Sequence, residues 1–190
     1  MNLFKFTPFI LFFSITLSGC YVDNGELLES NTNGYGHYTN KTINVSVLTP
    51  LNWQTSVSIG GEYVMNAPDS DNISILIAST SVTLLMGDIA SDSTTLDEFK
   101  TYRASQINEK EIGPKLNISI NKSTLSSYPA YEMIYTYLPE GMNKKIYVRE
   151  TSTLVKGKVY RIWYYAQENT YQKYEKEYHM IKNSYSILGN

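Results

Sequence analysis

The stretch YPAYEMIYTYL, residues 128–138, decides the fold class of this chain. Its side chains alternate with a period of two, which is the period of a β-strand. One face would carry Tyr131, Met133, Tyr135 and Tyr137, and the other Glu132, Ile134, Thr136 and Leu138. Two further runs with strand character follow, at 144–155 and 158–166, with glycines in the connections, as hairpins favour. The second half of the chain therefore predicts an antiparallel meander.

Shorter strands and two helices are predicted around this meander. The strands are expected at 42–47, 62–65, 72–80 and 115–120, where β-branched residues lie between turn-forming residues. A helix capped by Ser93, Thr94 or Thr95 should run to about Lys110, because Asp97 and Glu98 suit its first turn. A second helix is expected over 170–184. Its apolar stripe, spaced by three and four, consists of Tyr171, Tyr174, Tyr178, Ile181 and Tyr185. The expected class is α+β, a central antiparallel sheet flanked by helices.

The N-terminus has the pattern of an export signal that ends in a lipidated cysteine. Lys5 precedes an apolar run over 6–17, which is too short to span a bilayer but matches the core of a signal peptide. The run ends in Leu-Ser-Gly-Cys at 17–20, which is similar to the lipobox of prokaryotic lipoproteins. Cys20 is therefore the predicted lipidation site. The alternative is an ordinary cleaved leader with Cys20 near the cut by chance.

The expected domain organisation follows from this leader. Residues 1–19 are predicted to be the signal peptide, and 20–40 the lipidated cysteine and a flexible tether rich in Asn, Gly and Ser. One domain would cover 41–190. Because Cys20 is the chain's single cysteine, lipidation would leave no thiol for nucleophilic, redox or metal chemistry. The expected location is the extracytoplasmic face of the cell membrane, with the lipid as anchor.

Composition and motifs give little sign of catalysis. A net charge of -2 and a pI near 5.7 make nucleic acid an unfavourable partner. His37 and His179 are far apart in the sequence, and the DSDN run at 69–72 lacks the residues that a calcium loop needs next. Glu109 and Glu111 could serve acid–base chemistry only if both faced a pocket. We therefore expect no catalytic residues, no metal site and no cofactor.

Tyrosine is the unusual component, with 17 residues. Most of the tyrosines in the meander should be core beneath a helix, and any that stay exposed would form a contact surface, since tyrosine has an apolar body and a polar tip. The possible contact face comprises Tyr131, Tyr135, Tyr137, Tyr160 and Tyr164.

The order of these elements resembles the PsbP-like family over about residues 40–188. The resemblance rests on Pro50 and Trp53 after the first strand and on four motifs. These are TLDEF at 95–99, SSYPAYEMIYTY at 126–137, GKVYRIWYYA at 157–166 and IKNSYSIL at 181–188. It implies an α/β/α sandwich shared with Mog1-type proteins, in a family of lumenal or lipid-anchored accessory and assembly proteins of photosystems and of prokaryotic lipoproteins. No photosystem-docking segment precedes the domain, and no metal-binding histidine of the family aligns with His37 or His179, so a photosystem role is not carried over.

Three functions follow as hypotheses. The first is a non-catalytic, lipid-anchored binding or assembly module with a protein partner in the membrane or envelope. The second is a surface lipoprotein that binds a small ligand or a cation. The third is a hydrolase with a site assembled from dispersed residues. A flat aromatic patch would favour the first, a closed pocket with converging polar groups the second, and a buried carboxylate or histidine beside a nucleophile the third.

Overall fold

The computed structural model describes residues 25–32, 34–58, 61–68, 73–91, 93–108, 118–139 and 141–189, with side chains from residue 34 onward. The predicted signal peptide and Cys20 lie outside the described residues. So do the DSDN run at 69–72 and the pair Glu109 and Glu111. No helix in the described part of the chain is long and apolar enough to span a membrane.

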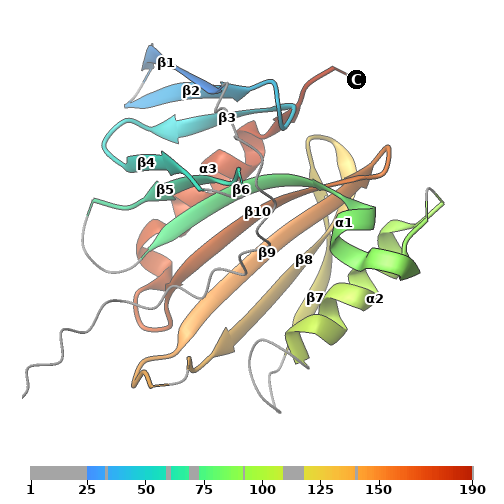
Figure 1. Ribbon diagram of the computed structural model, residues 1–190. Coiled ribbons are helices and arrows are strands. Elements are labelled where there is room, and N and C mark those ends of the chain that lie inside the picture. Colours follow the sequence, from blue (N-terminus) through green and yellow to red (C-terminus); the bar gives the residue numbers. More distant parts are fainter. Residues whose placement is uncertain are drawn as a thin grey trace, which may run out of the picture.

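A seven-stranded antiparallel sheet forms the centre of the molecule (Figure 1). Its strands, in spatial order, are β4 (Gln54–Val57), β5 (Tyr63–Asn66), β6 (Ser74–Ser81), β10 (Lys158–Gln167), β9 (Ile146–Val155), β8 (Tyr128–Tyr137) and β7 (Ser119–Leu125). The last four follow one another along the chain as hairpin neighbours, which confirms the predicted meander. The register places Tyr131, Ser152 and Arg161 side by side on β8, β9 and β10, so these residues share one face.

A smaller sheet corrects the predicted tether. Its strands are β1 (Gly25–Thr32), β2 (Tyr35–Asn40), β3 (Val45–Pro50) and β11 (Ser186–Ile187). Residues 25–40 therefore belong largely to strands, and the domain begins before residue 41. The physical reason is burial: the Tyr38 ring stacks on Tyr63 with 3.5 Å between ring centroids, and buried Asn40 accepts hydrogen bonds from the Thr42 and Ile43 amides. The polar composition of the segment conceals these two anchors.

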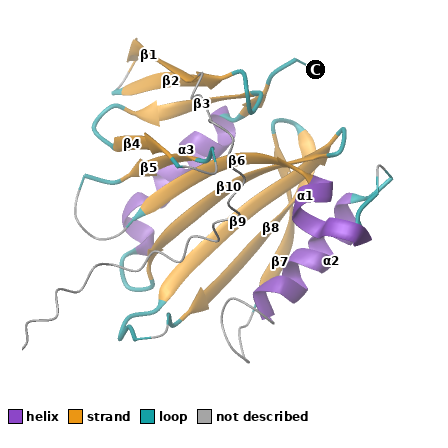
Figure 2. Cartoon of the chain, viewed as in Figure 1, coloured by secondary structure: helices purple, strands orange, loops and turns teal. Residues whose placement is uncertain are grey.

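Helices cover both faces of the large sheet (Figures 1 and 2). On one face lie α1 (Val82–Met86), η1 (Gly87–Ile89) and α2 (Leu96–Gln106); on the other lie η3 (Tyr171–Tyr174) and α3 (Glu175–Ser184). We call these the α2 side and the α3 side. Val82, Met86 and Phe99 belong to the core of the α2 side, and Tyr178 and Ile181 to the core of the α3 side. The predicted α+β sandwich is confirmed.

A local side-chain cap fixes the start of α2. Thr95 caps α2: its hydroxyl accepts from the Glu98 amide, and the Glu98 carboxylate accepts from the Thr95 amide. The predicted cap is confirmed. The predicted terminal helix is divided into η3 and α3, and Tyr178 and Ile181 of its apolar stripe are buried against the sheet.

The two ends of the sheet differ in what they carry. We call one the hairpin end, formed by the connections 41–44, 126–127 and 156–157 together with α1. Three contacts hold it together: Leu188 N donates to Asn44 O at 2.8 Å, Ile187 N to Ser126 Oγ at 2.8 Å, and Val82 N to Gly157 O at 2.9 Å. The other is the loop end, formed by the β8–β9 connection over 138–145, the start of β2 and the start of α3.

Candidate functional site

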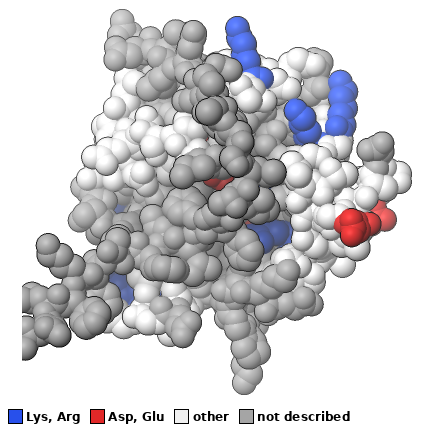
Figure 3. Space-filling model, viewed as in Figure 1, with Lys and Arg blue, Asp and Glu red and all other residues white. Residues whose placement is uncertain are grey.

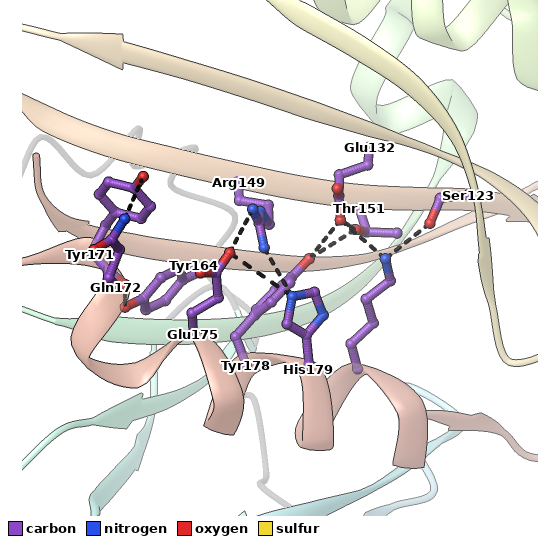
Figure 4. Close-up of polar contacts among 11 residues, drawn as sticks. Ser123, Glu132, Arg149, Thr151, Tyr164, Tyr171, Gln172, Glu175, Tyr178 and His179 are labelled. Atoms are coloured by element: carbon purple, nitrogen blue, oxygen red, sulfur yellow. Dashed lines mark hydrogen bonds and ion pairs between the residues drawn. The ribbon is translucent and has the colours of Figure 1, made fainter.

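A polar cluster lies between α3 and strands β7, β8 and β9 (Figure 4). The Glu132 carboxylate on β8 accepts from the Lys182 ammonium of α3 at 3.0 Å and from the Thr151 hydroxyl of β9 at 3.1 Å. Lys182 also donates to Ser123 Oγ on β7 at 2.9 Å, and the Tyr178 hydroxyl lies 2.8 Å from Thr151 Oγ1. The cluster therefore ties one helix to three neighbouring strands.

The charges in this cluster compensate one another. Partial burial would raise the pKa of Glu132, but the hydrogen bond and the positive charge of Lys182 outweigh it and lower that pKa below its usual value. Burial raises the pKa of the Tyr178 phenol well above its usual value, so the group stays neutral. Glu132 is thus a paired, ionised carboxylate. It does not have the raised pKa of a general acid.

The exposed margin of the same cluster is built on Arg149. Its guanidinium donates to Glu175 Oε1 at 2.9 Å and lies 3.2 Å from His179 Nε2, both on α3 (Figure 4). It also lies over the rings of Tyr147 and Tyr178, 5.9 and 5.5 Å from their centroids. This margin fixes the start of α3 to β9.

A second charged cluster occupies the α2 side. Glu150 of β9 is completely buried, and its carboxylate accepts from Arg103 Nε of α2 at 3.0 Å and from Ser152 Oγ at 3.0 Å. Burial would raise the pKa of Glu150, but the charges of Arg103 and Arg161 lower it. The Arg161 guanidinium lies 4.2 Å from the ring centroid of Trp163. Burial lowers the pKa of Arg161, against the opposing effect of Glu150.

The five predicted contact tyrosines do not lie on one face. Tyr131, Tyr135 and Tyr137 are on the α2 side, whereas Tyr160 and Tyr164 belong to the core of the α3 side. The reason is register: Tyr131 shares its row with Arg161, so the even-numbered residues of β10 point to the opposite face. The single face is therefore a wrong prediction. Tyr137 is half-buried and the other four are buried, so most of the set is core, as expected.

The predicted histidines are not brought together. His37 is exposed on β2, and His179 is half-exposed on α3. Among the described residues, no group of three or more His, Cys, Asp or Glu side chains is arranged to hold a metal ion. Sequence reasoning missed the two carboxylates Glu132 and Glu150. Their signal was available, because each is a charged residue in the middle of a strand otherwise rich in apolar and aromatic residues.

Two surface hollows stand apart from these clusters. One, of about 570 Å³, lies between η1 and α2 and is lined by residues that include Met86, Ile89 and Tyr102. The other, of about 350 Å³, is at the loop end. It is lined by Gly34, Tyr35, Pro50, Leu51, Asn52, Trp53, Tyr174 and Glu177. Neither lining includes Glu132 or Glu150, so both carboxylates act as structural ion pairs away from the two hollows.

Comparison with known proteins supports the fold alone. No protein-family profile and no curated protein matches the chain. Among solved structures, it is similar to cyanobacterial PsbP (CyanoP) from Synechocystis sp. PCC 6803, with a TM-score of 0.55 and 12% identity, over 81% of this chain and 92% of that one. It is also similar to a protein from Bacteroides thetaiotaomicron, with a TM-score of 0.52 and 10% identity, over 77% of this chain and 46% of that one. The chain has a PsbP-like fold, as its sequence pattern predicts.

Proposed function

We propose that this chain is a lipid-anchored, non-catalytic binding or assembly module on the extracytoplasmic face of the cell membrane. The signal-peptide pattern and the lipobox around Cys20 support the anchor. The PsbP-like fold is compatible with a module of this kind, because the family that the sequence resembles includes lipid-anchored accessory and assembly proteins. The observation that carries the proposal furthest is the short chain between Cys20 and the first strand.

The length of this connection limits where the membrane can lie. β1 begins at Gly25, five residues after Cys20. Since an extended residue spans at most about 3.6 Å, a lipid on Cys20 would lie within about 18 Å of Gly25. The domain would then stand directly on the bilayer, without the 20-residue tether that the composition predicts.

Gly25 lies at the hairpin end of the domain. Gly25 pairs with Asn40, which precedes the connection 41–44. Lys41 on this connection and Lys156 and Lys158 around the β9–β10 turn are exposed, and Figure 3 shows Lys and Arg side chains at the top and upper right of the view. Lysines near an anionic lipid surface are attracted by about 1 kcal/mol each.

Exposed apolar side chains accompany these lysines. Leu84 of α1 is 64% exposed and Ile89 of η1 is 68% exposed. Ser81, which precedes α1, pairs with Lys158, so the apolar and cationic residues adjoin. Asp88 of η1, next to Ile89, is an exposed charge of the opposite sign. An apolar tip flanked by cations matches a surface that rests in the headgroup region of a membrane.

The loop end would then face away from the membrane. β8, β9 and β10 are ten residues long, or about 33 Å, which exceeds the reach of the Cys20 connection. Tyr137 and Ile146 are half-buried there, and Leu138 and Met142 are exposed. Aromatic residues and methionine are enriched in protein interfaces. We place the contact with a protein partner on these four residues, the loop-end patch.

The charged clusters support a role without catalysis. Buried Glu150 lies beside Ser152, as the hydrolase hypothesis expects, but Glu150 accepts from that hydroxyl and is paired with Arg103. Both Glu150 and Glu132 have lowered pKa values, and each is held by a cation and by a hydroxyl group. Lys182, beside Ser123, is engaged by Glu132 and so is not a free base for that hydroxyl. These groups stabilise the sandwich.

The test is site-specific photo-crosslinking in native membranes. A photoreactive residue at Met142 should give a reproducible protein adduct, and one at Leu84 should not, because Leu84 would face lipid. Cys20→Ser is the control: it should move the protein to the soluble fraction and abolish the adduct. Membrane retention of Cys20→Ser would contradict the anchor. An anchored protein with no adduct at Met142 would contradict the protein partner.

A further inference from the structure

The hollow at the loop end has the lining of a site for an organic cation. It lies where β2 begins, β3 ends and α3 begins. Tyr35 of β2 pairs with Pro50 of β3 at this point. Three aromatic residues, Tyr35, Trp53 and Tyr174, line it from three elements of the fold. The rings of Trp53 and Tyr174 meet edge to face, with 5.2 Å between centroids, so a right-angled aromatic corner borders the hollow.

One carboxylate completes the lining. Glu177 is the third residue of α3, and its Oε2 atom is buried without a hydrogen-bond partner among the described residues. A buried acceptor without a partner is costly, and a cation beside it would remove that cost. Burial raises the pKa of the Tyr35 phenol, and the negative charge of Glu177 raises it further, so the carboxylate lies close enough to act on that hydroxyl.

We infer that this hollow binds an organic ammonium cation, of the quaternary or methylated class, between the faces and edges of Tyr35, Trp53 and Tyr174 and against the carboxylate of Glu177. Aromatic rings attract such cations through their negative faces, and Trp does so most strongly. The Lys173 ammonium, which is outside the lining, already lies 5.5 Å from the ring centroid of Tyr174.

Other ligand classes fit the lining less well. An anion would meet the Glu177 carboxylate. A calcium ion needs six to eight oxygen ligands, whereas the side chains of this lining offer one carboxylate, one amide and two phenols. The volume of about 350 Å³ is within the range of small-molecule sites and exceeds what a trimethylammonium group requires. The inference goes beyond the proposed anchoring and does not depend on it.

The experiment is an NMR titration of the ¹⁵N-labelled protein, solubilised from membranes in non-ionic detergent, with choline as the probe. The chain has two tryptophans, so two indole N–H signals are expected. Trp53 lines the hollow and Trp163 lies on the α2 side, which makes Trp163 an internal control. Choline should shift the Trp53 signal saturably and leave the Trp163 signal in place. The neutral isostere 3,3-dimethylbutan-1-ol should bind at least about tenfold more weakly, because it lacks the charge.

Two matched variants test the carboxylate. Glu177→Gln keeps the shape and removes the charge, and should weaken choline binding by about tenfold. Glu175→Gln makes the same change on the same helix outside the hollow, where Glu175 pairs with Arg149, and should leave the affinity within about twofold. A Trp53 signal that choline does not move would overturn the inference. Equal binding of the neutral isostere, or equal losses in the two variants, would also overturn it.

Discussion

Each face of the central sheet holds a carboxylate paired with cations, and the two carboxylates are buried to different depths. On the α3 side, Glu132 is 15% exposed and its cation, Lys182, comes from the covering helix. On the α2 side, Glu150 is 0% exposed and two arginines serve it, Arg103 from the covering helix and Arg161 from the neighbouring strand. Two cations lower the pKa of each carboxylate, because Arg149 acts on Glu132 beside Lys182. The two faces therefore differ mainly in depth, and the loss of solvation increases with burial. The burial of the carboxylate should therefore determine how much free energy of unfolding is lost when each cluster is broken.

The largest effect is expected from Glu150→Gln. The variant leaves Arg103 and half-buried Arg161 without their counter-charge, and removing one partner of a buried ion pair costs about 3–5 kcal/mol. Glu132→Gln is the matched change on the other face and should cost about 1–2 kcal/mol, because the Glu132 carboxylate is 15% exposed whereas that of Glu150 is 0% exposed. Urea unfolding of both variants measures the difference. Equal losses would break the comparison between the faces.

Acid should remove stability from both faces in a defined direction. The pKa values of Glu132 and Glu150 are lowered in the folded state, so each carboxylate stabilises the fold above its unfolded pKa of about 4.3. This contribution is lost as the pH falls through the lowered folded-state pKa. The free energy of unfolding of the wild type should fall below about pH 5, and that of Glu132→Gln should fall less steeply. Parallel curves for the two proteins would contradict the pairing of Glu132.

The smallest effect is expected at the exposed margin of the α3 side. His179 is 49% exposed, and Arg149 keeps Glu175 as its partner when the imidazole is removed. His179→Ala should change the free energy of unfolding by less than about 0.5 kcal/mol. A loss comparable to that of Glu132→Gln would show that exposure does not rank these contacts.

Local patterns in the sequence predicted the parts of the fold that depend on local order. The alternation at Tyr131–Tyr137 and the cap at Thr95 were both confirmed, because each depends on residues that are neighbours along the chain. The strands at 25–40 were missed because the segment is rich in polar residues, and the contacts of Tyr38 with Tyr63 and of Asn40 with Ile43 reach beyond it.

The site was harder to predict than the fold, because strand register decides it. Tyr160 and Tyr164 lie on the opposite face of the sheet from Tyr131, because of the register between β8, β9 and β10. Sequence periodicity alone does not determine that register. The clusters of Glu132 and Glu150 likewise join side chains 47 to 50 positions apart. The aromatic hollow brings together residues from the start of β2, the β3–β4 turn and α3, which no motif connects.

The orientation on the membrane tests the central claim most directly. Two variants each carry one added cysteine, at Leu84 or at Met142, which is labelled with an environment-sensitive fluorophore. Each labelled protein is reconstituted in vesicles of phosphatidylcholine and phosphatidylglycerol with brominated acyl chains, which quench a fluorophore that enters the bilayer. The label should attach once per chain, because lipid would block Cys20, and it should be quenched at Leu84 and not at Met142. Two labels per chain would contradict lipidation of Cys20. Stronger quenching at Met142 than at Leu84, with one label per chain, would contradict the proposed orientation and leave the anchor standing.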